Sequence, residues 1–208
     1  MSVAALKVPQ VVGVETTKIF TLEEYLRREE RAVHKHEFYN GQIIRMAGGK
    51  ARHNEIAMNI GSAIKYVVRP LPLKYRVYNS DQKIYLETEK FGVYPDAVVV
   101  CEEPEFWQGR EDLIINPLLI VEVASRSTAQ YDRKGKFELY RQLTSFKEYI
   151  LVQQKTASVE SWFRIEPNTW NIDTVKDLSA SIVLRSLGIS IPLSEVYENI
   201  VFNEKAKK

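Results

Sequence analysis

The sequence predicts a mixed α/β (α+β) fold in which helices pack on the faces of one β-sheet. Short apolar runs of strand-like composition recur along the chain, and between them lie segments whose apolar residues have helical spacing. The 208 residues are enough for one sizeable core and too few to favour two independent domains. We expect a loose arm over 1–17, one domain over 18–202 and a solvated tail over 203–208.

Two local signals mark the start of the expected domain. Thr21 is followed three residues later by Glu24, and this capping box predicts a short helix from Leu22 to about Ala32. The pair Asn40-Gly41 then separates two strand-like runs. It predicts a hairpin, because the tight turn requires positive φ angles that these two residue types adopt most easily.

The middle and the end of the chain alternate between the two kinds of pattern. Apolar residues at helical spacing predict a helix from about Arg52 to Val68, which Pro70 and Pro72 end. A second helix is predicted over Tyr131–Leu143, and a short one after Pro192. Strands are predicted at Tyr75–Tyr78, Gln82–Glu87, Tyr94–Cys101, Leu118–Ala124, Glu148–Gln153, Ser158–Ile165, Trp170–Lys176 and Ser181–Arg185.

Composition excludes several classes of protein. No stretch approaches the roughly 20 apolar residues that cross a bilayer, and the N-terminal segment lacks the apolar run of a signal peptide. The single cysteine, Cys101, cannot form an internal disulfide, so we expect a cytoplasmic protein. Because the net charge is only +2, any nucleic-acid binding must depend on a local cluster of charge.

Glu122 is the most informative single residue. It lies within PLLIVEVAS, a run that is apolar on both faces and therefore predicts a central strand covered on both sides. An ionised carboxylate there costs several kcal/mol unless a cation or hydrogen bonds compensate. Either a metal ion or an ordinary arginine or lysine partner satisfies that requirement.

Asp96 precedes another apolar run, DAVVV, and follows Pro95. Pro-Asp is common in turns, but a second acidic residue beside a strand also suits a metal shared with Glu122. Mg²⁺ or Mn²⁺ takes one or two carboxylates together with carbonyl oxygens, waters and phosphate. The backbone carbonyl of Val123 is then the expected third ligand.

Lys136 is the expected helper of this acidic pair. On the helix predicted over Tyr131–Leu143 it shares a face with the apolar residues Leu139 and Tyr140, whereas Lys134 points outward. An inward lysine can stabilise negative charge that develops on a phosphoryl group or orient the attacking water. It can also cover apolar surface with its stem and keep its ammonium group in water.

Four strings carry a resemblance: YPDAVVV, LLIVEVASRST, YDRKGKFELYRQL and KEYILV. In this order and spacing they resemble the Uma-type family of restriction-endonuclease-like proteins, within the PD-(D/E)XK nuclease superfamily, from about residue 18 to residue 200. The resemblance implies a mixed sheet with an αβββαβ core, a Mg²⁺-type site and hydrolysis of DNA phosphodiesters. It assigns the first acidic position to Asp96 and the second to Glu122.

The resemblance also implies further site residues. Ala124 stands where the superfamily has its lysine, and in the family this lysine has moved to the next helix, where Lys136 matches it. Glu37 matches an acidic residue that assists the metal or its waters. His53 matches a recurring histidine that contacts phosphate or relays a proton near neutral pH; a plain surface histidine at the helix start is the alternative.

A basic stretch is the candidate DNA-binding surface. Asp81 is the only acidic residue among its cations in the sequence, and tyrosines lie between them. Such a surface can follow a phosphate backbone, although an ordinary basic surface has the same composition. The cations are Lys65, Arg69, Lys74, Arg76 and Lys83.

The leading hypothesis is a Mg²⁺- or Mn²⁺-dependent endodeoxyribonuclease with DNA as its partner. A homodimer is compatible with it, since two sites suit the cutting of both strands of a duplex. The alternative is a nuclease-fold module that binds nucleic acid or a protein without cutting. A third possibility is a structural dimer formed through the C-terminal strands.

Overall fold

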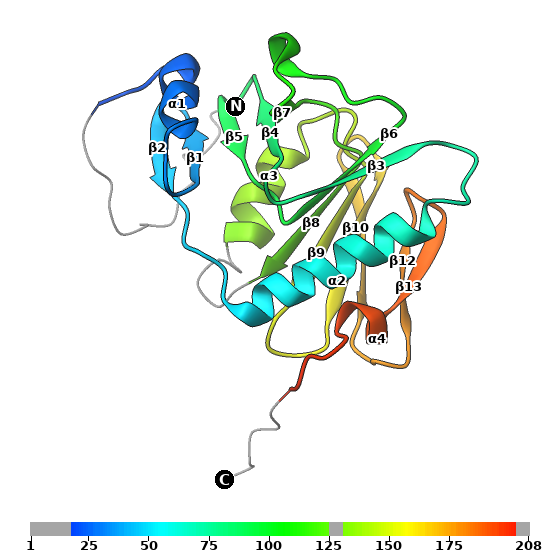
Figure 1. The fold of residues 1–208 in the computed structure, drawn as a ribbon. Coiled ribbons are helices and arrows are strands. Elements are labelled where there is room, and N and C mark those ends of the chain that lie inside the picture. The colour runs from blue at the N-terminus through cyan, green and yellow to red at the C-terminus, as the bar shows by residue number, and fades with distance from the viewer. Residues whose placement is uncertain (1–17, 125–130, 203–208) are drawn as a thin grey trace.

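The computed structural model describes residues 18–124 and 131–202, and a six-stranded sheet lies at its centre (Figure 1). The strand order is β11-β10-β9-β8-β6-β3, with β8 and β9 parallel and the other neighbours antiparallel. The strands are β3 (Tyr75–Asn79), β6 (Ala97–Cys101), β8 (Leu119–Ala124), β9 (Glu148–Gln153), β10 (Val159–Glu166) and β11 (Thr169–Val175).

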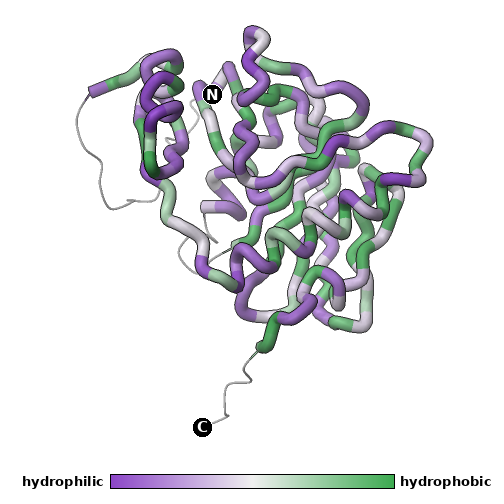
Figure 2. The backbone as a smooth tube through the Cα atoms, in the orientation of Figure 1, coloured by the Kyte–Doolittle hydropathy of each residue, from purple (hydrophilic) through white to green (hydrophobic). Residues whose placement is uncertain are grey.

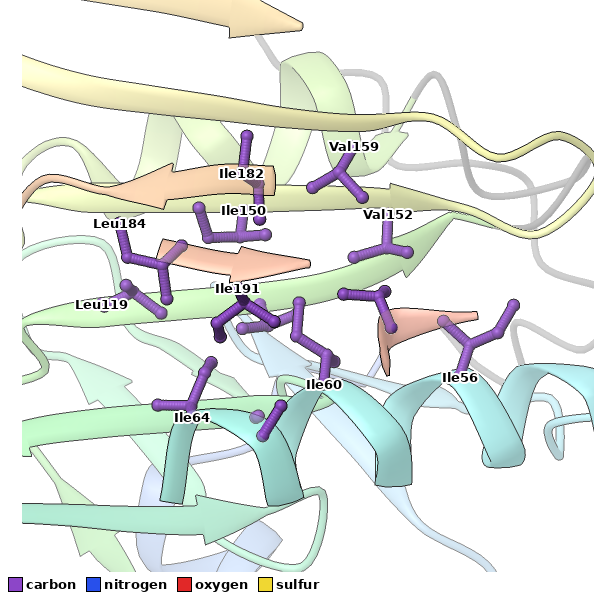
Figure 3. Close-up of a cluster of buried hydrophobic side chains, with 14 of the residues drawn as sticks. Ile56, Ile60, Ile64, Leu119, Ile150, Val152, Val159, Ile182, Leu184 and Ile191 are labelled. Atoms are coloured by element: carbon purple, nitrogen blue, oxygen red, sulfur yellow. The ribbon is translucent and has the colours of Figure 1, made fainter. Parts of the chain in front are cut away.

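One face of this sheet is covered by helix α2 (Ala51–Val67), which crosses it in Figure 1. The fully buried side chains of Ile56, Ile60 and Ile64 point from α2 toward the strands (Figure 3). Hydrophilic and hydrophobic residues alternate along α2 (Figure 2), as expected of a helix with one buried face. The hairpin of β12 (Ser181–Leu184) and β13 (Ile189–Pro192) and the short helix α4 (Leu193–Val196) complete this layer.

The other face is covered by a short helical segment and an aromatic cluster. A π-type turn, η2 (Tyr131–Lys136), continues into α3 (Phe137–Tyr140), whose side chains pack against Tyr149 and Trp162 of the sheet. The connection from β8 through this segment to the parallel strand β9 is a βαβ unit. Together, α2, β3, β6, β8, α3 and β9 form the expected αβββαβ core.

A second, five-stranded sheet has the order β2-β1-β5-β4-β7. Helix α1 (Leu22–Glu29) packs on it through Tyr25 and Leu26, beside the hairpin of β1 and β2. A 3₁₀ turn, η1 (Trp107–Gly109), precedes the last strand. The strands are β1 (His36–Tyr39), β2 (Gln42–Arg45), β4 (Lys83–Leu86), β5 (Phe91–Val93) and β7 (Leu113–Ile114).

Several local predictions are confirmed. Thr21 and Glu24 form both hydrogen bonds of the capping box. Asn40 and Gly41 have φ angles of 44° and 84° at the hairpin turn between β1 and β2. The mixed α+β class and most expected elements are present, within a few residues of the predicted ends.

Other predictions are wrong. The expectation of one sheet fails, because β1, β2, β4, β5 and β7 pair among themselves. The helix expected over Tyr131–Leu143 is a π-type turn and a four-residue α-helix. Gly135 lies against the Tyr131 ring, where a Cβ atom would be 2.5 Å from Cδ2, so close packing there depends on glycine. The strand expected over Tyr94–Cys101 begins only at Ala97.

The arm expected over 1–17 and the tail expected over 203–208 lie outside the described residues. Within the described part, no helix is both long enough and apolar enough to cross a membrane.

Candidate active site

Asp96 lies just before the first residue of β6, where the pairing with β8 ends. The antiparallel register sets Ala97 opposite Val121, so Asp96 and Glu122 are the next pair of positions along the two strands. The Asp96 side chain takes the place of a backbone partner there, because its Oδ2 accepts the Val123 N–H at 2.7 Å. This bond fixes the carboxylate beside the strand that carries Glu122.

His53 reaches the same carboxylate from the first turn of α2. Its Nε2 is 2.9 Å from Asp96 Oδ1, and its Nδ1 is 3.2 Å from the amide nitrogen of Gln154. Gln154 also donates to the Val123 carbonyl, at 3.3 Å. The hydrogen bond to Asp96 raises the pKa of His53 and outweighs burial, which acts in the opposite direction. His53 is therefore tied to the candidate site.

Glu122 is 4% exposed and points to the α3 side of the sheet. Its Oε1 accepts hydrogen bonds from Lys136 Nζ at 3.0 Å and from Tyr140 Oη at 2.9 Å. Burial raises the pKa of Glu122 well above its usual value, against the effect of Lys136. No described residue donates to its second oxygen, Oε2.

Lys136 is 6% exposed and lies between carboxylates. Its Nζ is 3.0 Å from Glu37 Oε1, 3.0 Å from Glu122 Oε1 and 3.9 Å from Asp132 Oδ1. Burial alone would lower the pKa of Lys136, but the carboxylates of Glu122 and Glu37 outweigh it and raise that pKa well above its usual value. Lys136 is thus a fixed cation, and the predicted contrast with the exposed Lys134 is confirmed.

Several buried carboxylates lie around the Lys136 ammonium group. Among the described residues, Glu37, Asp96 and Glu122 lie close to Lys136 and His53, and the Asp132 and Asp96 carboxylates add to burial in raising the pKa of Glu122. Glu37 Oε1 is buried and, despite its distance to Lys136, has no hydrogen bond of good geometry among the described residues. A buried carboxylate oxygen without a hydrogen-bond donor is stabilised by a nearby cation.

Carboxylate oxygens such as those of Asp96 and Glu122 suit a hard cation that also binds water or phosphate. Among the described residues there is no group of three or more His, Cys, Asp or Glu side chains placed to hold a metal ion. Mg²⁺ needs fewer, because it commonly uses one or two carboxylates and completes its shell with waters and substrate phosphate. The neighbouring positions of Asp96 and Glu122 meet this lower requirement.

The basic stretch is less uniform than the sequence suggests. Asp81 is the only acidic residue within the stretch, but β3 pairs with β6 and brings Glu102 and Glu103 beside the start of β3. Arg76 is 2.6 Å from Glu103, and the Lys74 backbone N–H donates to Glu102.

Lys83 does not lie on the surface expected of the basic stretch. It is 8% exposed and 3.0 Å from Asp112, because β4 belongs to the other sheet. Three cations of the stretch have side chains with no ion pair among the described residues: Lys65, Arg69 and Lys74.

Two polar residues of the site were not predicted. Tyr140 follows Lys136 by four residues on the same helical face, so this spacing was the available signal for its hydroxyl group. Gln154 directly follows β9, and nothing in its local sequence indicates that it contacts His53.

The mixed sheet with its αβββαβ core is that of the restriction-endonuclease-like fold. A crystal structure described as a "putative nuclease belonging to DUF820" from Anabaena variabilis superposes on this chain with a TM-score of 0.65. The superposition covers 85% of this chain and 97% of the Anabaena chain, at 16% sequence identity. At this identity the likeness supports the fold.

The chain belongs to the Uma2 family, described as "Putative restriction endonuclease", whose model matches residues 22–194. Two relatives from Synechocystis sp. (strain ATCC 27184 / PCC 6803 / Kazusa) carry the names "Uncharacterized protein sll1609" and "Uncharacterized protein slr1290". The first is 36% identical over 174 residues, which is 81% of this chain and 94% of that protein. The second is 31% identical over 180 residues, or 86% and 92%. The predicted family is confirmed.

Proposed function

We propose that this protein is a divalent-metal-dependent endonuclease that hydrolyses phosphodiester bonds of DNA. One observation supports this most directly: two neighbouring strands bring Asp96 and Glu122 together beside a buried lysine. Membership of a family described as restriction endonucleases agrees with the proposal.

In this proposal Asp96, Glu122 and the Val123 carbonyl hold Mg²⁺ or Mn²⁺. A cation held there lowers the pKa of a bound water and neutralises charge on phosphoryl oxygens. The Val123 N–H, by binding Asp96 Oδ2, orients that carboxylate, and Gln154 holds the Val123 carbonyl in place. Each ligand is therefore supported by a hydrogen bond from a neighbouring group.

Lys136 and His53 supply positive charge on two sides of the acids. Glu37 and Glu122 hold the Lys136 ammonium group, which stabilises negative charge on the phosphoryl group as the bond breaks. His53, whose pKa Asp96 raises, contacts a phosphate oxygen or relays a proton. Glu37 acts through Lys136 and is a positioning residue.

Plasmid nicking tests the proposal. Purified protein with Mn²⁺ converts supercoiled DNA to the open circular form, and Asp96→Asn abolishes the conversion. Asp177→Asn, which makes the same change in an exposed turn, retains wild-type nicking and serves as the matched control. Equal nicking by Asp96→Asn and wild type would refute the assigned site.

A binding module without hydrolysis is the second candidate, and one observation favours it. Both candidate acids already bind protein donors, Asp96 with His53 and Glu122 with Lys136, so part of their charge is compensated without a metal. Calorimetric titration with Mn²⁺ separates the two candidates. Binding that Glu122→Gln weakens supports the nuclease, whereas absence of binding leaves only the module.

A further inference from the structure

A groove of about 510 Å³ lies between α2 and β3, and His53 and Asp96 are among the residues that line it. This volume is within the range of sites that hold small ligands, about 300–1,000 Å³. The groove follows α2 from His53 to Lys65, a distance of about 18 Å along the helix at 1.5 Å per residue. It therefore begins at the candidate active site and leads away from it along one helix.

The middle of the groove is apolar. Ala57, Val77 and Ala97 line it, and Met58 adds a side chain that is 65% exposed. Methionine is flexible and polarisable, so it adapts to a flat ring placed against it. Next to it, Gly61 contributes no side chain, which leaves room over the helix. The surface of this part suits the face of a nucleobase.

The polar residues of the groove suit the rest of a nucleotide. Asn79 Oδ1 accepts from the Asp81 N–H and Asn54 Nδ2 donates to the Gly49 carbonyl, which leaves the Asn79 amide nitrogen as a donor and the Asn54 amide oxygen as an acceptor for the edge of a base. Lys65, exposed at the far part of the groove, has no ion pair among the described residues and suits a phosphate. Along the groove, His53 and Asp96 are thus followed by the amide of Asn54, then by the apolar surface and finally by Lys65.

We infer that this groove binds an unpaired nucleotide of the strand whose phosphodiester lies at Asp96, so that the substrate is single-stranded or locally unpaired DNA. The inference rests on the proposed function and names its substrate class. In an intact duplex the faces of a base are stacked and its edge is paired, so the base cannot enter such a groove. In a single strand or a bulge the faces and the edge of the base become available, and contact with protein side chains replaces stacking on neighbouring bases.

Binding without metal tests the inference. A fluorescein-labelled oligonucleotide, single-stranded or annealed to its complement, is titrated with the full chain in EDTA and followed by fluorescence anisotropy. Wild type binds the single strand at least about tenfold more tightly than the duplex. Ser62→Trp places a large ring in the groove from an exposed position on α2 and weakens single-strand binding about tenfold, the scale of one stacked base.

Two controls keep this test specific. Ser179→Trp makes the same change in the exposed turn after β11 and binds as wild type does. Lys65→Gln, compared with Lys176→Gln, tests the groove by loss of charge and remains informative if Ser62→Trp is misfolded. Equal or tighter binding of the duplex, binding to neither form, or full binding by both groove variants would overturn the inference.

The outcome is separable from that of the proposed function. Nicking with Mn²⁺ that persists without any preference for single strands refutes the inference alone. The opposite result is tight single-strand binding that Ser62→Trp removes, with no hydrolysis in Mn²⁺. It refutes the nuclease proposal and supports the binding of an unpaired nucleotide in the groove.

Discussion

Replacing Lys136 with Met removes the cation that lies between two buried carboxylates. The side chains of Lys136, Glu37 and Glu122 are 7%, 7% and 6% exposed, and Nζ is 3.0 Å from an oxygen of each acid. At an effective dielectric constant of about 20, one such pair is worth about 5 kcal/mol before desolvation. Removing the lysine also removes its own desolvation cost, so we expect a net loss of about 3–5 kcal/mol in the free energy of unfolding.

The loss depends on pH in a defined direction. Burial raises the pKa of Glu122 in the folded protein, and removal of Lys136 raises it further. A carboxyl whose pKa is higher when folded stabilises the fold below its unfolded pKa, near 4.5, and this stabilisation is lost as pH rises through the folded value. Lys136→Met is therefore closest to wild type near pH 4.5 and furthest from it at pH 8.

Urea unfolding followed by tryptophan fluorescence measures this difference at each pH. Lys134→Met is the matched control, because Lys134 is exposed two residues earlier, and it changes stability by less than about 0.5 kcal/mol. The double variant Lys136→Met/Glu122→Gln recovers part of the loss, since one uncompensated charge is removed with the cation. A Lys136→Met variant within about 1 kcal/mol of wild type at pH 8 would refute the interpretation of Lys136 as the compensating cation.

Three further changes test the fold around the site. Glu148→Ala removes a fully buried carboxylate that accepts from the Ser161 and Ser186 hydroxyls and from the backbone N–H groups of Arg185 and Ser186, and should cost about 3 kcal/mol or more in urea unfolding. Gly41→Ala places a side chain at φ 84° in the β1–β2 turn and should lower stability by about 1–2 kcal/mol, seen as a lower Tm. Thr21→Ala removes the capping box and should cost about 1 kcal/mol, with little change in the circular dichroism of the native state. Unchanged stability in any of the three would contradict the corresponding contact.

The local parts of the site could be predicted from the sequence because their signals are local. A run that is apolar on both faces indicates a doubly covered strand, so the burial of Glu122 and its need for a partner follow from PLLIVEVAS alone. The inward direction of Lys136 follows from helical spacing, and it holds although η2 is a π-type turn. These predictions depend on residues within one turn or one strand.

The remaining contacts depend on pairings that no local pattern encodes. Glu37 meets Lys136 because the β1–β2 hairpin docks near α3, although 99 positions separate the two residues. Glu103 meets Arg76 because of the β3–β6 register, which changes a basic stretch into a partly neutral one. The strands β5 and β7 have three and two residues, too few to show a period.

The position of the lysine follows from which face of β8 carries Glu122. Residues 122 and 124 point to the same side of that strand, and Ala124 is 3% exposed within the aromatic cluster that α3 covers. A cation can reach Glu122 on this closed face either from position 124 of β8 or from the helical segment that covers the face. Because position 124 is alanine, the charge comes from Lys136 on the helical segment. The ion pair between Lys136 and Glu37 also couples the β1–β2 hairpin to the site. Lys136 therefore supplies positive charge at Glu122 and links the second sheet to the first.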